Sequence, residues 1–190
     1  MSDRPVVYHI PACPFCQRLK ILLDLKGQVD EIDYVVVDIT KPREPALLVK
    51  TRGKTALPVL ELPDGRILKE SLVILDYLDT VFGASSLRRA DPYEAAVEAM
   101  LISKEGPLTS AGYRLVMNQD LDARKTLCDR LLGLHSDIDD FLTEHARDSV
   151  FLFDDFGLAE TVFTPIFMRF WFLDYFEEFD LPEIDGFKRV

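Results

Sequence analysis

Two cysteines lie three positions apart near the start of the chain, in the run Cys13-Pro14-Phe15-Cys16. Pro14 has no amide hydrogen and a fixed φ, so it suits the first turn of a helix. Cys13 is then expected at the helix N-cap, where unpaired backbone N–H groups and the positive end of the helix dipole favour the thiolate. Such positions lower a cysteine pKa from about 8.5 into the range ~3.5–7.5, and the thiolate is the nucleophile. The motif therefore predicts redox or thiol-transfer chemistry at Cys13.

Cys16 is expected one turn after Cys13 on the same helix face, where it could attack a mixed disulfide formed on Cys13. A zinc site is the first alternative, but Cys128 is the only further thiol and the three histidines show no paired ligand spacing. Burial as inert core residues is the second alternative, since free cysteine is often buried. The proline between the two cysteines favours catalysis, and we expect no metal.

The composition indicates a globular cytoplasmic protein. With 190 residues, 48% of them hydrophobic, the chain can bury the core of one large or two small domains. No apolar run is long enough to span a bilayer, and the first residues lack a charged-then-apolar signal segment. Cytoplasmic thiols stay reduced, so the cysteine pair is expected to be catalytic rather than a structural disulfide. The formal net charge of −11 at pH 7 argues against nucleic acid or an anionic membrane as a partner.

The first 81 residues alternate between strand and helix patterns. The predicted strands are 5–10, 31–39, 57–62 and 66–69, and the predicted helices are 15–26, 46–50 and 70–80. A helix between the first two strands makes them parallel. Pro63-Asp64-Gly65 between the last two strands is a hairpin signal. The predicted order is β-α-β-α-β-β-α.

The rest of the chain is predicted to be helical. Residues 82–91 interrupt the periodicity and predict a linker between a domain at 1–81 and an all-α domain at 92–190. One predicted helix covers 92–118, with a kink at Gly106-Pro107, and a second covers 122–147. The chain ends inside a further helical pattern, so the second domain is expected to be cut short at its C-terminus.

A third predicted helix in this domain starts after the apolar run at 151–153. Gly157 is its expected N-cap, and Glu160 can reach back to the cap amide as half of a capping box. Pro165 is expected to bend this helix. Its aromatic side chains are expected in the core. Four other large side chains could line a pocket for a second substrate or belong to the core equally well: Tyr113, Met117, Trp171 and Tyr175.

These motifs in combination resemble the cytosolic glutathione S-transferases. The resemblance rests on the cysteine motif, on Leu57-Pro58 at a strand start, on Glu70-Ser71 at a helix start, and on the helical second part. Within that family the chain is most similar to the omega-like, cysteine-type branch. Stretches such as 9–11 and 151–155 are also similar to the bacterial glutathione lyases that cleave thioethers in lignin β-aryl-ether breakdown. The resemblance implies a thioredoxin-like first domain followed by an all-α domain.

The resemblance also implies that glutathione is the co-substrate. Leu57, before an expected cis-proline at Pro58, would pair through its backbone with the cysteinyl part of the tripeptide. Ser71, at a helix N-terminus, suits the γ-glutamyl carboxylate. Glu70 would take the ammonium group.

Three further residues complete the implied glutathione site. The glycyl carboxylate needs a cation, for which Lys54 is the candidate and Arg43 the second choice. A solvated loop lysine with no ligand is the alternative for Lys54. Phe15 would pack beside the bound tripeptide.

The sequence as a whole predicts a glutathione-dependent thiol transferase or reductase. The Cys13 thiolate would attack the sulfur of a glutathionylated substrate, which is a small, aromatic or carbonyl-bearing α-keto thioether or disulfide. The resulting Cys13–glutathione disulfide would be resolved by glutathione or by Cys16. Conjugation of glutathione to small electrophiles and a non-catalytic binding module are the alternatives. The family leads us to expect a homodimer.

Overall fold

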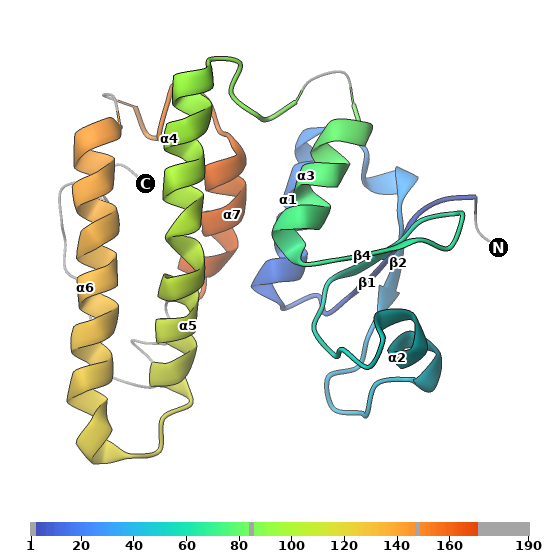
Figure 1. Cartoon of the computed structure of the whole chain (residues 1–190), viewed down its shortest axis with the longest axis horizontal. Helices are drawn as coiled ribbons and strands as arrows, with labels where there is room; N and C mark the ends of the chain where they lie inside the picture. Colours follow the sequence, from blue (N-terminus) through green and yellow to red (C-terminus); the bar gives the residue numbers. More distant parts are fainter. Residues whose placement is uncertain (1–2, 84–85, 147–148, 171–190) are drawn as a thin grey trace. The chain divides into compact units, whose positions relative to one another are not determined.

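The structure, a computed structural model, describes residues 3–83, 86–146 and 149–170. The chain forms two compact units, Met1–Ser86 and Leu87–Val190 (Figure 1). The division between the units falls within the predicted linker at 82–91. The predicted ending inside a further helix, together with Trp171 and Tyr175, lies outside the described residues.

The first unit has the order of elements that the sequence predicts. Its strands are β1 (Val6–His9), β2 (Asp33–Val36), β3 (Val59–Glu61) and β4 (Ile67–Lys69). Its helices are α1 (Pro14–Leu25), the 3-10 turn η1 (Val29–Glu31), α2 (Pro45–Thr51) and α3 (Ser71–Val81). Helix α1 ends at the Lys26 cap, and Gly27, directly after it, is left-handed (φ 64°), a conformation that glycine adopts easily at a helix end.

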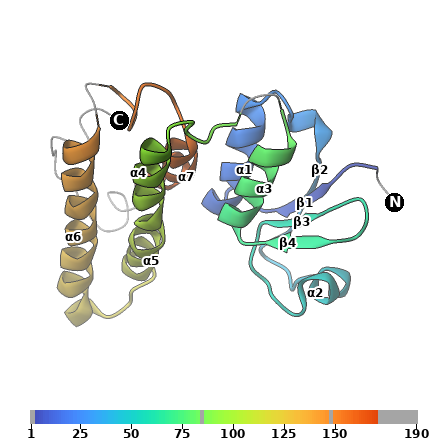
Figure 2. The same ribbon diagram turned by 45° about the horizontal axis from the view of Figure 1, so that its top comes forward.

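The strands form one mixed sheet in the order β2-β1-β3-β4. β1 runs parallel to β2, as the crossover predicts, and antiparallel to β3, which in turn is antiparallel to β4. Helices α1 and α3 lie side by side on the sheet, and α2 lies apart from them next to β4 (Figures 1 and 2). The core between the helices and the sheet includes fully buried side chains such as Leu19, Leu22, Leu60 and Leu78.

The strand register brings three segments to one end of this sheet. Tyr8 pairs with Val59, and Val59 pairs with Lys69. The exit of β1, the entry of β3 and the exit of β4 therefore meet at the same end, because β3 is antiparallel to both neighbours. The segments that continue from this end carry the two cysteines, the Leu57-Pro58 step and Glu70-Ser71.

β2 is shorter than the predicted strand at 31–39. The sheet gives β2 only four partners, from Val6 opposite Asp33 to His9 opposite Val36. The amide of Val37 still donates to the carbonyl of His9 at 2.8 Å, but β1 ends at His9, and Ile39 beyond it is exposed. A run of β-branched residues indicates that a strand fits there, but the length of the neighbouring strand decides where it ends.

The described helices of the second unit are α4 (Pro92–Ser103), α5 (Glu105–Val116), α6 (Leu121–His145) and α7 (Leu158–Phe167). The prediction of one kinked helix over 92–118 was wrong, because α4 ends at Ser103 and α5 begins at Glu105. Pro107 explains the break. A proline lacks the N–H that would bond to the carbonyl four residues earlier, here that of Ser103, and its ring crowds that carbonyl.

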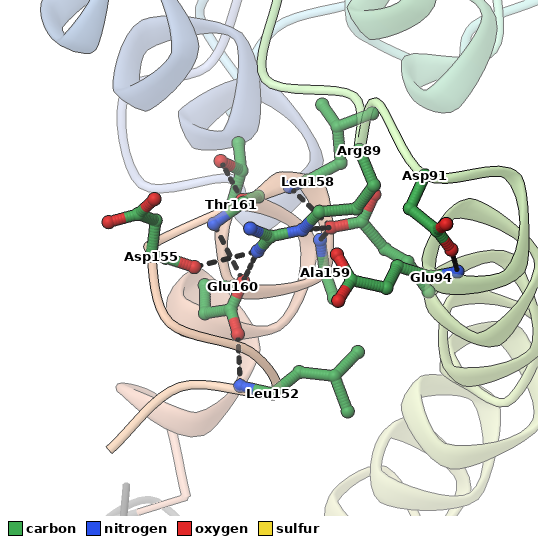
Figure 3. A network of polar contacts seen from close by, with 11 residues as sticks. Arg89, Asp91, Glu94, Leu152, Asp155, Leu158, Ala159, Glu160 and Thr161 are labelled. Atoms are coloured by element: carbon green, nitrogen blue, oxygen red, sulfur yellow. Dashed lines mark hydrogen bonds and ion pairs between the residues drawn. The ribbon is translucent and has the colours of Figure 1, made fainter. Parts of the chain in front are cut away.

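The start of α7 is capped by glutamates from two places in the chain. Gly157 is the N-cap, as predicted, and Glu160 accepts hydrogen bonds from the amides of Gly157 and Leu152, both at 2.8 Å (Figure 3). Glycine has no side chain, so it cannot supply the other half of a capping box. Glu98 of α4 reaches across instead and accepts from the amides of Leu158 (3.0 Å) and Ala159 (3.4 Å).

Arg89 completes this network, which we call the α7 cap. Its Nε lies 3.4 Å from Oε1 of Glu98, and its Nη2 donates to the carbonyl of Asp155 at 2.6 Å (Figure 3). A Cβ at position 157 would collide with Nη2 of Arg89 and Oε1 of Glu98. Glycine is therefore the residue that leaves room for Glu98, beside the half-buried Arg89 guanidinium, to take over the capping role.

Candidate functional site

Cys13 is the N-cap of α1, as the sequence predicts. Its backbone is extended (φ −75°, ψ 125°), and its carbonyl accepts from the amides of Cys16 (3.1 Å) and Gln17 (3.0 Å). Pro14 occupies the first helical turn. The Cys13 side chain is half-buried, so it sits where the helix dipole favours a thiolate and where a small molecule could still reach it.

Cys16 is buried, with 4% of its surface exposed. A hydrogen bond with the Cys13 side chain, its burial and the neighbouring Cys13 charge raise the pKa of Cys16 well above its usual value, although a backbone hydrogen bond at Ile10 opposes this. Cys16 therefore stays a neutral thiol that donates toward the Cys13 sulfur. The two cysteines therefore differ in accessibility, with Cys13 half-buried and Cys16 buried beside it.

The Leu57–Pro58 peptide bond is cis, as expected. Pro58 is buried and Leu57 is half-buried directly before β3. Because β3 begins beside the end of β1, this step lies at the sheet end from which the chain continues to Cys13. The backbone of Leu57 is thus placed on the side of the sheet where Cys13 begins its helix.

Glu70 and Ser71 join β4 to α3 at the same sheet end. Glu70 has a positive φ of 70°, a conformation that costs a residue with a side chain about 1–3 kcal/mol and that clusters at functional sites. Ser71 is the first residue of α3, so its amide is one of the unpaired donors at the helix start. A carboxylate placed there would meet oriented N–H groups and the positive end of the helix dipole.

Lys54 lies beside Glu70. Its Nζ is 4.0 Å from Oε1 of Glu70, and both side chains are largely exposed, at 63% and 71%. The Lys54 ammonium thus lies near Glu70, which is expected to bind the ammonium group at the γ-glutamyl end of glutathione. Arg43 donates from Nε to the carbonyl of Thr55 at 3.3 Å, two residues before Leu57. The assignment of Lys54 to the glycyl carboxylate, with Arg43 as second choice, stays a prediction.

Arg18 contacts two residues of the candidate site, and the sequence interpretation missed it. Its side chain is buried (1% exposed), and its Nη1 donates to Oγ of Ser71 at 3.0 Å. Its guanidinium carbon lies 5.0 Å from the centre of the Phe15 ring. The available signal was its spacing: Arg18 follows Phe15 by three positions and precedes Leu22 by four, so a cation falls within the apolar face of α1.

The structure describes two of the four side chains named for a second-substrate pocket, and their exposure does not support that prediction. Tyr113 and Met117 are exposed, at 47% and 75%. Trp171 and Tyr175 lie outside the described residues.

Two observations concern other kinds of site. Among the residues that the structure describes, no three His, Cys, Asp or Glu side chains gather where they could hold a metal ion. Within the same part of the chain, no helix combines the length and the apolar composition needed to cross a membrane.

Comparison with known sequences connects this geometry to one family. Residues 7–86 match the family model described as glutathione S-transferase, N-terminal domain. Among curated proteins, glutathione S-transferase omega-1 of Sus scrofa is 34% identical over 105 residues, which is 54% of this chain and 42% of that protein. The chain spans about half the length of the curated relatives it matches.

Solved structures show the same fold. Glutathione transferase Omega 3C from Trametes versicolor matches 95% of this chain and 78% of its own, with a TM-score of 0.78 and 23% identity. A glutathione S-transferase domain-containing protein from Marinobacter aquaeolei VT8 matches 94% and 90%, with a TM-score of 0.71 and 25% identity. The predicted architecture, a thioredoxin-like domain followed by a helical one, is confirmed. The similarity to lignin-type glutathione lyases stays a prediction.

Proposed function

We propose that this protein is a glutathione-dependent thiol transferase, because residues 7–86 match the family model described as glutathione S-transferase, N-terminal domain. The observation that carries the proposal is the position of Cys13 at the N-cap of α1. At the same sheet end lie the cis Leu57–Pro58 step and the start of α3 at Ser71. A peptide that carries a thiol and carboxylates needs three features in order to bind and react. These are a reactive thiolate, a backbone edge to pair with and a helix N-terminus.

The proposed reaction begins with the Cys13 thiolate attacking the glutathione sulfur of a glutathionylated substrate. A bond forms between the two sulfurs, and the bond from that sulfur to the substrate breaks. The substrate leaves with the electron pair, as a thiolate from a disulfide or as an enolate from an α-keto thioether, and takes a proton from water. A second glutathione thiolate then attacks the glutathione sulfur of the mixed disulfide, releasing glutathione disulfide and the Cys13 thiolate.

A cysteine at this position favours thiol transfer over conjugation. Conjugation needs a group that holds glutathione as a free thiolate, which a hydroxyl can do without forming a bond to it. A cysteine thiolate instead captures a sulfur that is joined to a good leaving group. The proposed substrates are therefore small disulfides or carbonyl-bearing thioethers of glutathione. A cytoplasmic homodimer is part of the same proposal.

We propose that the tripeptide binds along the sheet end already described. The backbone of Leu57 pairs with its cysteinyl part, and Ser71 receives its γ-glutamyl carboxylate. Glu70 takes the ammonium group, which requires its exposed pair with Lys54 to open. Exposed ion pairs contribute only about 0–1 kcal/mol, so this opening is a small barrier to binding.

A comparison of two substrates tests the proposed function. Purified protein is given a glutathionyl disulfide of a small thiol and, in parallel, an α-keto thioether of glutathione, each with glutathione in excess. Turnover of either one above the uncatalysed rate supports thiol transfer, and their ratio defines the substrate class. If neither is turned over while glutathione is conjugated to a small aryl halide, the conjugating alternative is correct.

The burial of Cys16 supports glutathione, rather than Cys16, as the group that resolves the mixed disulfide. Only 4% of the Cys16 surface is exposed, and its hydrogen bond with Cys13 and its burial raise the pKa of its thiol, which must ionise before it can attack. Its contribution is then a hydrogen bond to the Cys13 sulfur. This is a positioning and electrostatic role.

This role leads to a prediction for two substitutions. Cys16→Ser keeps a donor and should lower turnover with a glutathionyl disulfide by no more than about threefold, whereas Cys16→Ala removes the donor and should lower it by about tenfold near neutral pH. The Cys16→Ala loss should shrink as the pH rises, because more Cys13 ionises. The pH–rate profiles of the three proteins measure this. A Cys16→Ser protein that accumulates the mixed disulfide and stops turning over would show instead that Cys16 is the resolving thiol.

A further inference from the structure

Arg18 is one of the most completely buried side chains of the first unit. Only 1% of its surface is exposed, and its neighbours on α1 include the buried Leu19 and Leu22. Placing a guanidinium in such surroundings carries a large desolvation cost unless it makes strong polar contacts. A residue of this kind therefore indicates a specific role, and its described contacts show where that role lies.

These contacts connect the cysteine helix to the start of α3. Nη1 of Arg18 donates to Oγ of Ser71 at 3.0 Å, and its guanidinium carbon is 5.0 Å from the Phe15 ring centre. Ser71 is the first residue of α3 and is only half-buried. The buried guanidinium thus contacts a hydroxyl whose own residue is partly exposed.

The chemistry of the donor fixes the direction of the Ser71 hydroxyl. A guanidinium has five N–H donors and no acceptor, so the Ser71 oxygen must be the acceptor in this contact. The hydroxyl hydrogen is then free to point away from Arg18 and to donate to an anion. The fixed positive charge, the oriented hydroxyl and the amides at the start of α3 all act in the same direction.

We propose that Arg18 is a positioning residue that turns Ser71 into a donor for the free α-carboxylate of a γ-glutamyl group. This rests on the proposed function, in which glutathione is the ligand. Arg18 itself does not touch the ligand. It makes the site select peptides that keep this carboxylate, and it does so from within the helix that carries Cys13.

The test measures binding rather than turnover, so that it is independent of the cysteine chemistry. Calorimetry gives the Kd of the full chain for S-methylglutathione and for the same molecule without its glutamyl α-carboxylate. The proteins are the wild type, Arg18→Met, Arg18→Gln, Ser71→Ala and the Arg18→Met/Ser71→Ala double variant. Far-ultraviolet circular dichroism establishes that each protein is folded, and Arg18→Gln provides the same comparison if Arg18→Met does not fold.

We expect Arg18→Met to weaken binding of S-methylglutathione about tenfold and to leave binding of the decarboxylated analogue unchanged. The double variant should bind S-methylglutathione no more weakly than Ser71→Ala, because both changes remove the same interaction.

Three results would overturn the inference. Equal weakening of both ligands would mean that Arg18 supports the fold in general. Losses that add in the double variant would mean that Arg18 does not act through Ser71. If the wild type does not bind S-methylglutathione at all, both the inference and the proposed glutathione site are wrong, and this result differs from the other two.

Discussion

Cys13→Ser should abolish glutathione-dependent thiol transfer. The substitution keeps the shape of the side chain and its place at the N-cap of α1. A serine hydroxyl is not ionised near neutral pH and cannot enter thiol–disulfide exchange, so the chain loses the atom that receives the glutathione sulfur. We expect the turnover of a glutathionyl disulfide to fall by roughly three orders of magnitude or more.

Cys128→Ser is the matched control for this substitution. Cys128 is the third free cysteine, half-buried on α6 in the second unit and remote in sequence from the motif. Its replacement should leave turnover within error of the wild type. Stopped assays that follow glutathione disulfide formation measure all three proteins. Residual activity above one tenth in Cys13→Ser would mean that another group performs the chemistry.

Glu98→Ala should strongly destabilise the second unit. Glu98 is 3% exposed, accepts from the amides of Leu158 and Ala159, and lies beside Arg89. Removing it leaves two helix-start amides without this acceptor and the half-buried Arg89 guanidinium without its nearest carboxylate. Breaking a buried charged pair by removing one partner costs about 3–5 kcal/mol, and we expect a loss of about 3 kcal/mol in urea unfolding followed by circular dichroism.

Glu98→Gln is the control, because it keeps an acceptor but removes the charge. Burial, opposed by the amide of Ala159 and by Arg89, raises the pKa of Glu98 above its usual 4.5. The folded state therefore holds this proton more tightly than the unfolded state. Wild-type stability should fall relative to Glu98→Gln as the pH rises from about 4.5 toward neutral. An equal loss in Glu98→Ala and Glu98→Gln at all pH values would contradict this account of the α7 cap.

Gly157→Ser should have opposite effects on stability in the wild type and in Glu98→Ala. Serine is normally a better N-cap than glycine, but here its Cβ would collide with Arg89 and Glu98. Gly157→Ser should therefore destabilise the wild type. In Glu98→Ala the space is partly vacated, so the same substitution should recover part of the lost stability by capping α7 directly.

Local patterns in the sequence were sufficient for most of the first unit. The Pro14 position fixed the start of α1, and Gly65 (φ 85°) confirms the hairpin that Pro63-Asp64-Gly65 predicted. These features depend on residues a few positions apart, which are visible in one sequence. The same holds for Gly157 and Glu160 at the start of α7.

The missed features depend on residues that are far apart in the sequence. Glu98 caps a helix that begins sixty positions later, and Arg18 reaches a serine fifty-three positions away. Each side chain alone looks like an ordinary charged residue on a helix. The signal for Arg18 was a cation on an apolar face, and the signal for Glu98 was a helix start whose glycine could not cap itself. Neither signal identifies the residue that Arg18 or Glu98 contacts, because tertiary packing alone brings those residues together.

The most direct test of the central claim is the intact mass of the protein after brief exposure to a glutathionyl disulfide near neutral pH. We expect a gain of one glutathionyl group, located on Cys13 by peptide mapping and removed by added glutathione. Cys16→Ser should show the same adduct, and Cys13→Ser should show none. An unmodified Cys13 in the wild type, or an adduct found on Cys128 instead, would contradict the proposal that Cys13 is the nucleophile.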